Sequence, residues 1–304
     1  MKKISKISVI GIGHVGSHIA SSLFTQGVCN EIALIDKEQD RALAHALDLM
    51  DMSCYLESDA KIYNGTYKDL EDSDILFVSV CGIFSTQDRL LELEASKNIV
   101  DDIAPKILES GFKGVILSVS NPCDIIANYL KERTGLNVIG TGTMLDSARL
   151  KLKLAKALNI STKSVQGFML GEHGNSQFLA KSLTSIHGIG VEDYLKYNNI
   201  DLSIDELEKE VIEGGMDIAK RKMCTEFGIG MSCAYLAKAI LNDERKVLSC
   251  STFVEEYGVY TSVPCIIGAG GVIEQVKFRL SEQEQVKFEK SCNVLREKLD
   301  DIRK

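Results

Sequence analysis

Short apolar segments alternate with longer amphipathic segments along the first half of the chain. Four of the short segments are rich in β-branched and other apolar residues and predict strands, at 7–10, 31–35, 74–80 and 114–119. Weaker patterns at 61–63 and 138–139 would bring the sheet to six strands. Helical periodicity marks the segments between them, at 14–26, 40–52 and 92–110. This alternation is typical of a parallel sheet with helices on its faces.

From about residue 145 the pattern changes to long helical segments, including 145–158 and 204–223. The stretch 247–276 is rich in glycine, serine, threonine and valine, and predicts hairpins. The last segment, 281–302, is a charged amphipathic helix whose first residues, Ser281-Glu282-Gln283-Glu284, fit a capping box. We therefore predict an α/β fold, in which a doubly wound parallel-sheet domain at 1–144 precedes an α+β domain at 145–304.

Composition excludes several classes of protein. With 304 residues, 45% of them hydrophobic, the chain can bury a large core. It has no uncharged apolar run of about 18 residues, and its first residues pass directly into a strand, so we expect neither a membrane span nor a cleaved signal. A net charge of −8 disfavours nucleic acid and anionic membranes as partners. The nine dispersed cysteines indicate reduced thiols in the cytoplasm, and their spacing predicts no metal site.

The motif Gly11-Ile12-Gly13-His14-Val15-Gly16 lies between the first strand and the first helix, where a dinucleotide-binding fingerprint belongs. Gly11 permits a tight turn, Gly13 lets the backbone approach a pyrophosphate, and Gly16 allows close helix packing. The amino terminus of the helix then faces the anion. His14 also fits an ordinary polar position on a helix face.

Asp36 ends the second predicted strand, 20 residues after Gly16. A carboxylate there would accept hydrogen bonds from the adenosine ribose hydroxyls and would repel a 2′-phosphate, which favours NAD over NADP. Two alternatives remain open. Asp36 also fits a turn at the end of a strand, and the neighbouring Lys37 could tolerate the extra phosphate.

A histidine stands between glycines in Leu170-Gly171-Glu172-His173-Gly174-Asn175. An imidazole with an ordinary pKa of about 6.5 exchanges a proton near neutrality, and the glycines would let a substrate approach it. The alternative is a histidine in a surface turn. Asp146 and Arg149 share one face of a predicted helix, which on its own would indicate a surface ion pair. A turn with the sequence Ser120-Asn121-Pro122 follows an apolar strand.

These motifs, in this order, resemble those of the L-lactate/malate dehydrogenase family, and the resemblance extends from Ile7 to the final helix. The runs 138–143 and 171–178 are most similar to the L-2-hydroxyisocaproate dehydrogenase branch. The resemblance implies a Rossmann domain that binds NAD, a substrate domain, reversible hydride transfer between NADH and a 2-oxo acid, and a homodimer or homotetramer. The residues it places at the cofactor are Gly11, Gly13, His14, Val15, Gly16, Asp36, Gly82 and Asn121.

The resemblance also implies catalytic roles. His173 would exchange a proton with the substrate oxygen, and Asp146 would fix its tautomer. Arg149 would hold the substrate carboxylate with a bidentate fork, and Arg89 would polarise the substrate carbonyl. Asn121 and Thr225 would complete the substrate site. The match around Thr225 is looser, because the family usually has Gly-Tyr where Met223-Cys224 stand and a small polar residue in place of Glu226.

The family's substrate loop is short in this chain, with only 83–88 between Gly82 and Arg89. It contains no second basic residue, and Asp88 would repel a second carboxylate, so a dicarboxylate such as oxaloacetate is disfavoured. Ile83 and Phe84 could line a pocket for a larger apolar side chain, as in 2-oxoisocaproate, or could simply pack the loop. We therefore predict a preference for larger 2-oxo acids, such as 2-oxoisocaproate or phenylpyruvate, over pyruvate. The alternatives are an L-lactate dehydrogenase and a catalytically silent NADH-binding or structural protein.

Family members that are activated by fructose-1,6-bisphosphate carry an arginine and a histidine where this chain has Lys151 and Gln166. Activation by that ligand is therefore not expected.

Overall fold

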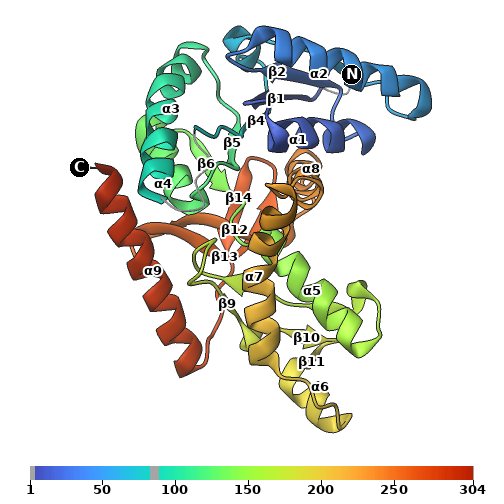
Figure 1. The fold of residues 1–304 in the computed structure, drawn as a ribbon, viewed down its shortest axis with the longest axis vertical. Helices are drawn as coiled ribbons and strands as arrows, with labels where there is room; N and C mark the ends of the chain where they lie inside the picture. The colour runs from blue at the N-terminus through green and yellow to red at the C-terminus, as the bar shows by residue number, and fades with distance from the viewer. Residues whose placement is uncertain (1–3, 83–88, 304) are drawn as a thin grey trace.

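A computed structural model describes residues 4–82 and 89–303 of the chain, and for 89–92 it describes the backbone alone. A nine-stranded sheet forms its centre, in the order β14-β13-β12-β6-β5-β4-β1-β2-β3 (Figure 1). Six of these strands are parallel and confirm the six predicted strands: β1 (Lys6–Ile10), β2 (Glu31–Ile35), β3 (Lys61–Asn64), β4 (Ile75–Val78), β5 (Val115–Ser118) and β6 (Asn137–Gly140). In their register, Val9 of β1 lies between Leu34 and Phe77.

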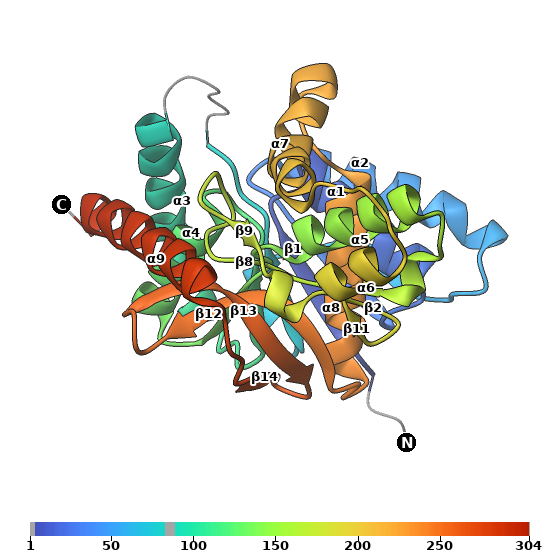
Figure 2. The same ribbon diagram turned by 90° about the horizontal axis from the view of Figure 1, so that it is seen from below.

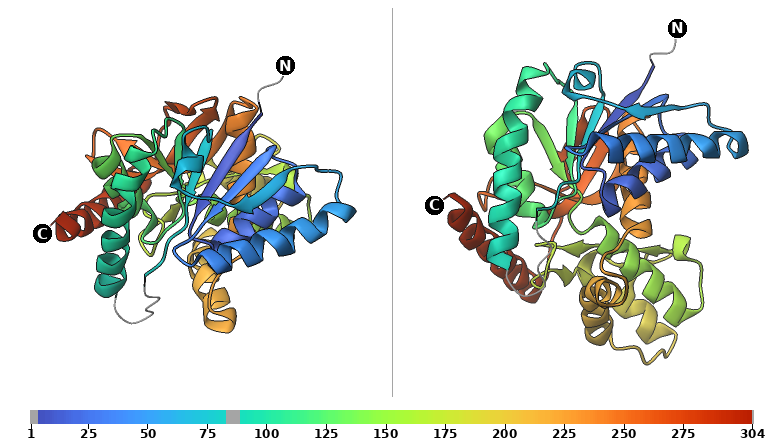
Figure 3. Two further views of the ribbon diagram at one scale, coloured as in Figure 1. Left: turned by 90° about the horizontal axis from the view of Figure 1, so that it is seen from above. Right: turned by 45° about the horizontal axis from the view of Figure 1, so that its top comes forward.

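Helices cover both faces of the parallel strands, as expected for a doubly wound sheet. The helices α1 (His14–Thr25) and α2 (Gln39–Asp51) lie on one face, and α3 (Arg89–Glu109) and α4 (Cys123–Thr134) lie on the other (Figure 3). The strands between them are buried along nearly their whole length, because both faces pack against helices. None of the described helices has the length and apolar character to cross a membrane.

The predicted hairpins extend the same sheet. Strands β12 (Lys246–Val254), β13 (Val259–Gly268) and β14 (Gly271–Gln275) are antiparallel, and β12 joins β6 where Ser251 pairs with Gly140. A Cβ atom on Gly140 would lie only 2.8 Å from Cβ of Ser251, so a glycine is needed for this approach. The sheet therefore continues across residue 144.

The rest of the chain packs partly against this sheet and partly around a smaller core to which Leu150, Leu154, Val165 and Val211 contribute. Its helices and strands are α5 (Met144–Leu158), β7 (Val165–Gln166), β8 (Met169–Leu170), β9 (Phe178–Leu179), β10 (Ser185–Ile186), β11 (Ile189–Gly190), α6 (Val191–Tyr197), α7 (Ile204–Lys222), α8 (Phe227–Leu241) and α9 (Glu282–Arg303). Short 3₁₀ turns occupy Met52–Tyr55, Tyr67–Leu70, Thr162–Ser164 and Lys181–Leu183.

Two features of this part position the site. The strand β9 packs between α7 and α9, so the loop before it is held from two sides (Figure 2). The predicted capping box also forms, because the backbone N–H of Ser281 donates to Glu284 at 2.8 Å and the backbone N–H of Glu284 donates to Ser281 Oγ at 3.4 Å.

Candidate active site

His173 lies in the loop between β8 and β9, at the meeting point of α4 and α5. Its backbone N–H donates to Oδ2 of Asp124 at 2.7 Å, and Nδ1 of its ring lies 2.7 Å from Oδ2 of Asp146. The ring keeps 30% exposure, so its second nitrogen, Nε2, remains open to a substrate. Backbone and side chain are thus held by two different carboxyl groups.

The glycines beside His173 are required by packing, whereas the sequence pattern suggested that they make way for a substrate. Gly171 has φ +89, and a Cβ atom there would lie 2.5 Å from Oγ of Ser291. A Cβ atom on Gly174 would lie 2.6 Å from the carboxyl carbon of Glu172. Both positions therefore exclude a side chain for structural reasons.

Asp146 and Arg149 lie one turn apart at the start of α5 and meet His173, as the resemblance implies. Asp146 is 2% exposed, and its second oxygen accepts a hydrogen bond from Nη1 of Arg149 at 2.5 Å. Its carboxylate therefore bridges the histidine and the arginine. The guanidinium of Arg149 is 15% exposed, which leaves part of its fork of N–H donors open to a ligand.

The space around Arg149 depends on a glycine pair in α7 that the sequence analysis did not single out. A Cβ atom on Gly215 would lie 3.3 Å from Nη1 of Arg149, whereas one on Gly214 would lie 3.8 Å from Cδ, an ordinary contact. Glycine inside a helix costs about 1 kcal/mol relative to alanine. Two adjacent glycines inside a helical segment of the sequence therefore indicate that another group approaches the helix closely.

Electrostatics prepare His173 to hold a proton. Partial burial lowers the pKa of its ring, but the charge and hydrogen bond of Asp146 outweigh this effect and raise the pKa above its ordinary value of 6.5. Burial would raise the pKa of Asp146, and the charge of His173 with that of Arg149 holds it below its ordinary value instead. Asp146 therefore stays ionised beside the histidine ring.

Asp124 is a second buried acid, in the first turn of α4, which sequence reasoning missed. Complete burial raises the pKa of its carboxyl group to about 6, against the opposing effect of the hydrogen bond from the His173 backbone. Glu172, the neighbour of His173, pairs with Lys298 of α9 and accepts from Oγ of Ser176 at 2.5 Å. These contacts fix the loop that carries His173.

The glycine fingerprint lies where the sequence predicted it, between β1 and α1. Gly11 has φ +90, and a Cβ atom there would lie 2.3 Å from the carbonyl oxygen of Ser79. A Cβ atom on Gly16 would lie 1.9 Å from the carbonyl oxygen of Gly11, so both glycines are needed by the fold. Around Gly13, in contrast, a Cβ atom would meet only open space, and no side chain caps α1 there. This opening at a helix amino terminus suits a pyrophosphate.

Asp36 closes the same site from the end of β2. Its carboxylate accepts hydrogen bonds from the backbone N–H groups of Ile12 at 2.7 Å and Glu38 at 2.9 Å, and it is half-buried. Each carboxylate oxygen has a further acceptor position, which the ribose hydroxyls of NAD could use. The residues present therefore fit the cofactor that the sequence predicts.

Five further predicted residues lie within the described part of the chain. His14 is exposed at the start of α1, and Val15 is half-buried beside it. Gly82 lies against α3, where a Cβ atom on it would lie 2.7 Å from Cβ of Ala95. Asn121 is exposed just before α4, and Thr225 is half-buried between α7 and α8. The side chain of Arg89 and the segment with Ile83, Phe84 and Asp88 lie outside the described residues.

All nine cysteines lie within the described part of the chain, and none of them forms a disulfide.

The arrangement provides the groups that hydride transfer to a 2-oxo acid requires. These are a histidine that can exchange a proton, an ionised aspartate that orients it, an arginine that can grip a carboxylate, and a dinucleotide fold.

Comparison with known proteins agrees with this geometry. The model of the lactate/malate dehydrogenase NAD binding domain matches residues 5–139, and that of the lactate/malate dehydrogenase alpha/beta C-terminal domain matches residues 143–304. An L-lactate dehydrogenase of Fusobacterium nucleatum is 40% identical, over 99% of this chain and 98% of the relative. L-lactate dehydrogenase 3 of Bacillus thuringiensis is 39% identical, over 98% of both chains.

A solved structure shows the same likeness. The minor L-lactate dehydrogenase from Enterococcus mundtii superposes with a TM-score of 0.94 at 34% sequence identity, and the match covers 98% of each chain. The chain therefore belongs to the lactate/malate dehydrogenase family and is an NAD-dependent 2-hydroxy acid oxidoreductase.

Proposed function

We propose that this enzyme interconverts a 2-oxo monocarboxylic acid and its L-2-hydroxy acid, with pyruvate and L-lactate as the first candidate pair. The observation that carries the reaction is the Asp146 carboxylate, which contacts His173 on one oxygen and Arg149 on the other. The choice of pyruvate is supported by relatives named L-lactate dehydrogenase, at 40% and 39% identity.

Each residue has a task in the proposed reaction. Bound NAD supplies the hydride for reduction and accepts it for oxidation. During reduction, Nε2 of protonated His173 gives its proton to the substrate oxygen while C2 receives the hydride, so one hydride and one proton convert the ketone into the alcohol. Asp146 holds the opposite ring nitrogen and stabilises the charged ring, and Arg149 orients the substrate carboxylate.

A single carboxylate in the substrate fits the charges of the chain. A second buried carboxylate would need its own cation, and the sequence between Gly82 and Arg89 contains no lysine or arginine. Asp88 adds a negative charge in the same segment. Oxaloacetate is therefore expected to be a poor substrate.

A larger apolar substrate, such as 2-oxoisocaproate or phenylpyruvate, is the second candidate. It is supported by the shortness of the segment 83–88 in the sequence and by the apolar character of Ile83 and Phe84. The names of the relatives give no support to it.

A substrate panel with NADH decides between the candidates. We expect pyruvate to give the highest kcat/KM and oxaloacetate a value at least about tenfold lower, a difference of 1.4 kcal/mol or more in transition-state binding. If 2-oxoisocaproate exceeds pyruvate by tenfold, the second candidate is correct. If the protein turns over none of these acids, the alternative of a catalytically silent NADH-binding protein is correct. His173→Asn is the matched inactive control.

We further propose a boundary between a cofactor domain at 1–144 and a substrate domain at 145–304, and a cytoplasmic homodimer or homotetramer. The start of α5 at Met144 supports the boundary. Exposed apolar side chains along α8, including Phe227, Met231 and Tyr235, support self-association. Light scattering measures the number of subunits directly, and a monomeric mass would contradict the proposal.

A further inference from the structure

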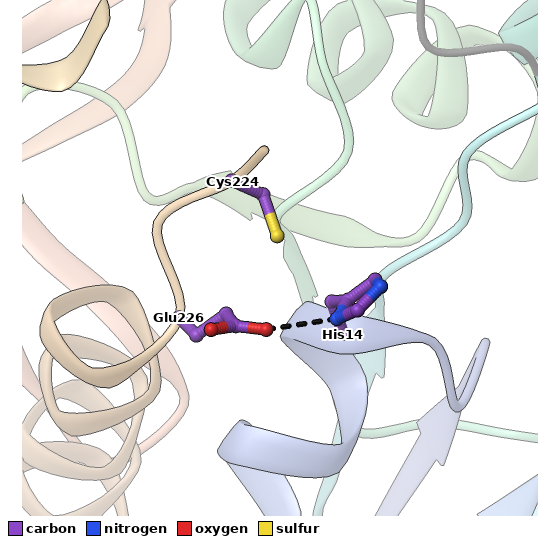
Figure 4. Close-up of side chains that lie close together, drawn as sticks. All are labelled: His14, Cys224 and Glu226. Carbon is purple, nitrogen blue, oxygen red and sulfur yellow. Dashed lines mark hydrogen bonds and ion pairs between the residues drawn. The ribbon is translucent and has the colours of Figure 1, made fainter. Parts of the chain in front are cut away.

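Three side chains with chemically different metal-binding atoms lie close together beside the amino terminus of α1. His14 begins α1, while Cys224 and Glu226 lie in the segment between α7 and α8 (Figure 4). One potential ligand atom from each residue lies within 4.8 Å of the other two, and Nδ1 of His14 lies 2.8 Å from Oε1 of Glu226. Cys224 and Glu226 have no task in the proposed reaction. His14 is related to it only by its position in the glycine fingerprint.

The ligand types point to one class of metal ion. Imidazole nitrogen, thiolate sulfur and carboxylate oxygen are the donors that Zn²⁺ takes in proteins, whereas Ca²⁺ and Mg²⁺ prefer oxygen alone. A thiolate and a carboxylate together neutralise the two charges of the ion. Access from solvent is open, because the side chain of His14 is 66% exposed.

The backbone before the cluster is also unusual. Met223 ends α7 with φ +75 and ψ −42, a positive-φ conformation that costs free energy for a residue other than glycine. This turn directs the next residue, Cys224, toward His14 across the gap between the two segments (Figure 4). The strained turn therefore brings the sulfur into the cluster.

Lys222 is the competitor of a metal ion at this site. Its ammonium group pairs with Oε2 of Glu226, while His14 pairs with Oε1. The carboxylate is therefore satisfied without a metal, and a divalent ion must displace these contacts. Lys222 also lies 4.3 Å above the ring of Phe227, so its ammonium group has another partner when it leaves the carboxylate.

We propose that His14, Cys224 and Glu226 form a zinc site with three protein ligands and one open position. An occupied site ties the amino terminus of α1, beside the proposed cofactor site, to the segment that carries Thr225, a proposed substrate-site residue. The spacing of the ligands in the sequence gives no hint of it, because His14 and Cys224 are 210 residues apart.

Titration of the metal-free full-length enzyme with Co²⁺ tests the proposal without any need for turnover. We expect one Co²⁺ per chain, with a thiolate-to-cobalt charge-transfer band in the near ultraviolet that Zn²⁺ abolishes. Cys224→Ser should remove the band, while Cys54→Ser, a change at another exposed cysteine, should keep it. Zn²⁺ should also raise the Tm of the wild type and of Cys54→Ser, but not that of Cys224→Ser.

Two further variants test the other ligands, with circular dichroism to verify that each is folded. His14→Asn and Glu226→Gln should each weaken Co²⁺ binding by at least about tenfold, because each removes a ligand. Lys222→Ala should tighten binding, because it frees Glu226. Absence of the band in the wild type, equal binding by Cys224→Ser, or weaker binding by Lys222→Ala would overturn the proposal.

Discussion

Nδ1 of His173 and Oδ2 of Asp146 lie 2.7 Å apart, with the aspartate almost completely buried. This contact fixes the orientation of the ring, and it raises the pKa of the ring. Since reduction uses the protonated ring, a raised pKa extends reduction toward higher pH. The same rise in pKa moves the onset of oxidation, which needs the neutral ring, to higher pH.

Asp146→Asn should therefore change the pH profile as well as the rate. We expect kcat for reduction to fall on the order of a hundredfold or more, because the amide neither fixes the tautomer nor stabilises the charged ring. The pH at which kcat/KM for reduction declines should move downward relative to the wild type, because the charge that raises the histidine pKa is gone. An unchanged midpoint in the pH profile would show that another group titrates.

Gly215→Ala tests whether α7 makes room for the substrate-binding arginine. The new methyl group would lie 3.3 Å from Nη1 of Arg149 and would displace it by a few tenths of an ångström. We expect KM for the 2-oxo acid to rise several-fold, while the free energy of unfolding is unchanged or rises by up to about 1 kcal/mol, because alanine favours the helix.

Gly214→Ala is the matched control, since it has the same helix propensity effect but only an ordinary 3.8 Å contact with Arg149. Steady-state kinetics and urea unfolding measure both quantities for the two variants. If both variants raise KM equally, the effect comes from the helix and not from the arginine.

Two substitutions distinguish a glycine that the cofactor requires from one that the fold requires. Gly13→Ala tests the first and Gly16→Ala the second. Gly13 has φ −85, which any residue adopts, and its Cβ would meet open space, so the variant should fold with nearly unchanged stability. KM for NADH should rise at least about tenfold, because the methyl group occupies the place of the pyrophosphate. Gly16→Ala should be strongly destabilised by its 1.9 Å clash with Gly11. A Gly13→Ala enzyme with normal KM would place the phosphates elsewhere.

The sequence pattern predicted the elements whose apolar periodicity is strong. All six parallel strands were confirmed, and so were helices α1, α2, α5, α7 and α9 near their expected limits. Helices α4 and α8 were missed for identifiable reasons. Helix α4 begins directly after Pro122, and only the turn at 120–122 was predicted in this region. Helix α8 is apolar on most sides and contains Gly228 and Gly230, so its helical period is weak.

The proposed catalytic residues were predictable because each carries a chemical group in a recognisable motif. Asp124 was not, because its partner is the backbone N–H of His173, which leaves no mark on the sequence. The proposed zinc ligands were missed for a related reason, since their proximity arises only when α1 and the segment after α7 meet. Sequence reasoning thus identified groups within motifs and missed contacts between distant segments.

Asp124→Asn tests the energetic effect of the buried acid. The pKa of Asp124 rises from an ordinary 3.8 to about 6 in the folded protein, so the folded state binds this proton more tightly than the unfolded chain does. The stabilising contribution of the protonated group is therefore fully present below pH 3.8 and is lost as the pH rises through 6. At neutral pH the loss amounts to roughly 3 kcal/mol of unfolding free energy.

Asparagine carries no charge and keeps an oxygen that can accept the His173 N–H. We therefore expect the free energy of unfolding of Asp124→Asn, relative to the wild type, to be higher at pH 8 than at pH 5, as measured by urea unfolding. Asp40→Asn, at an exposed acid on α2, is the control for the loss of one negative charge. An Asp124→Asn difference that is equal at both pH values would mean that the carboxyl group stays ionised throughout, with partners that fully compensate its burial.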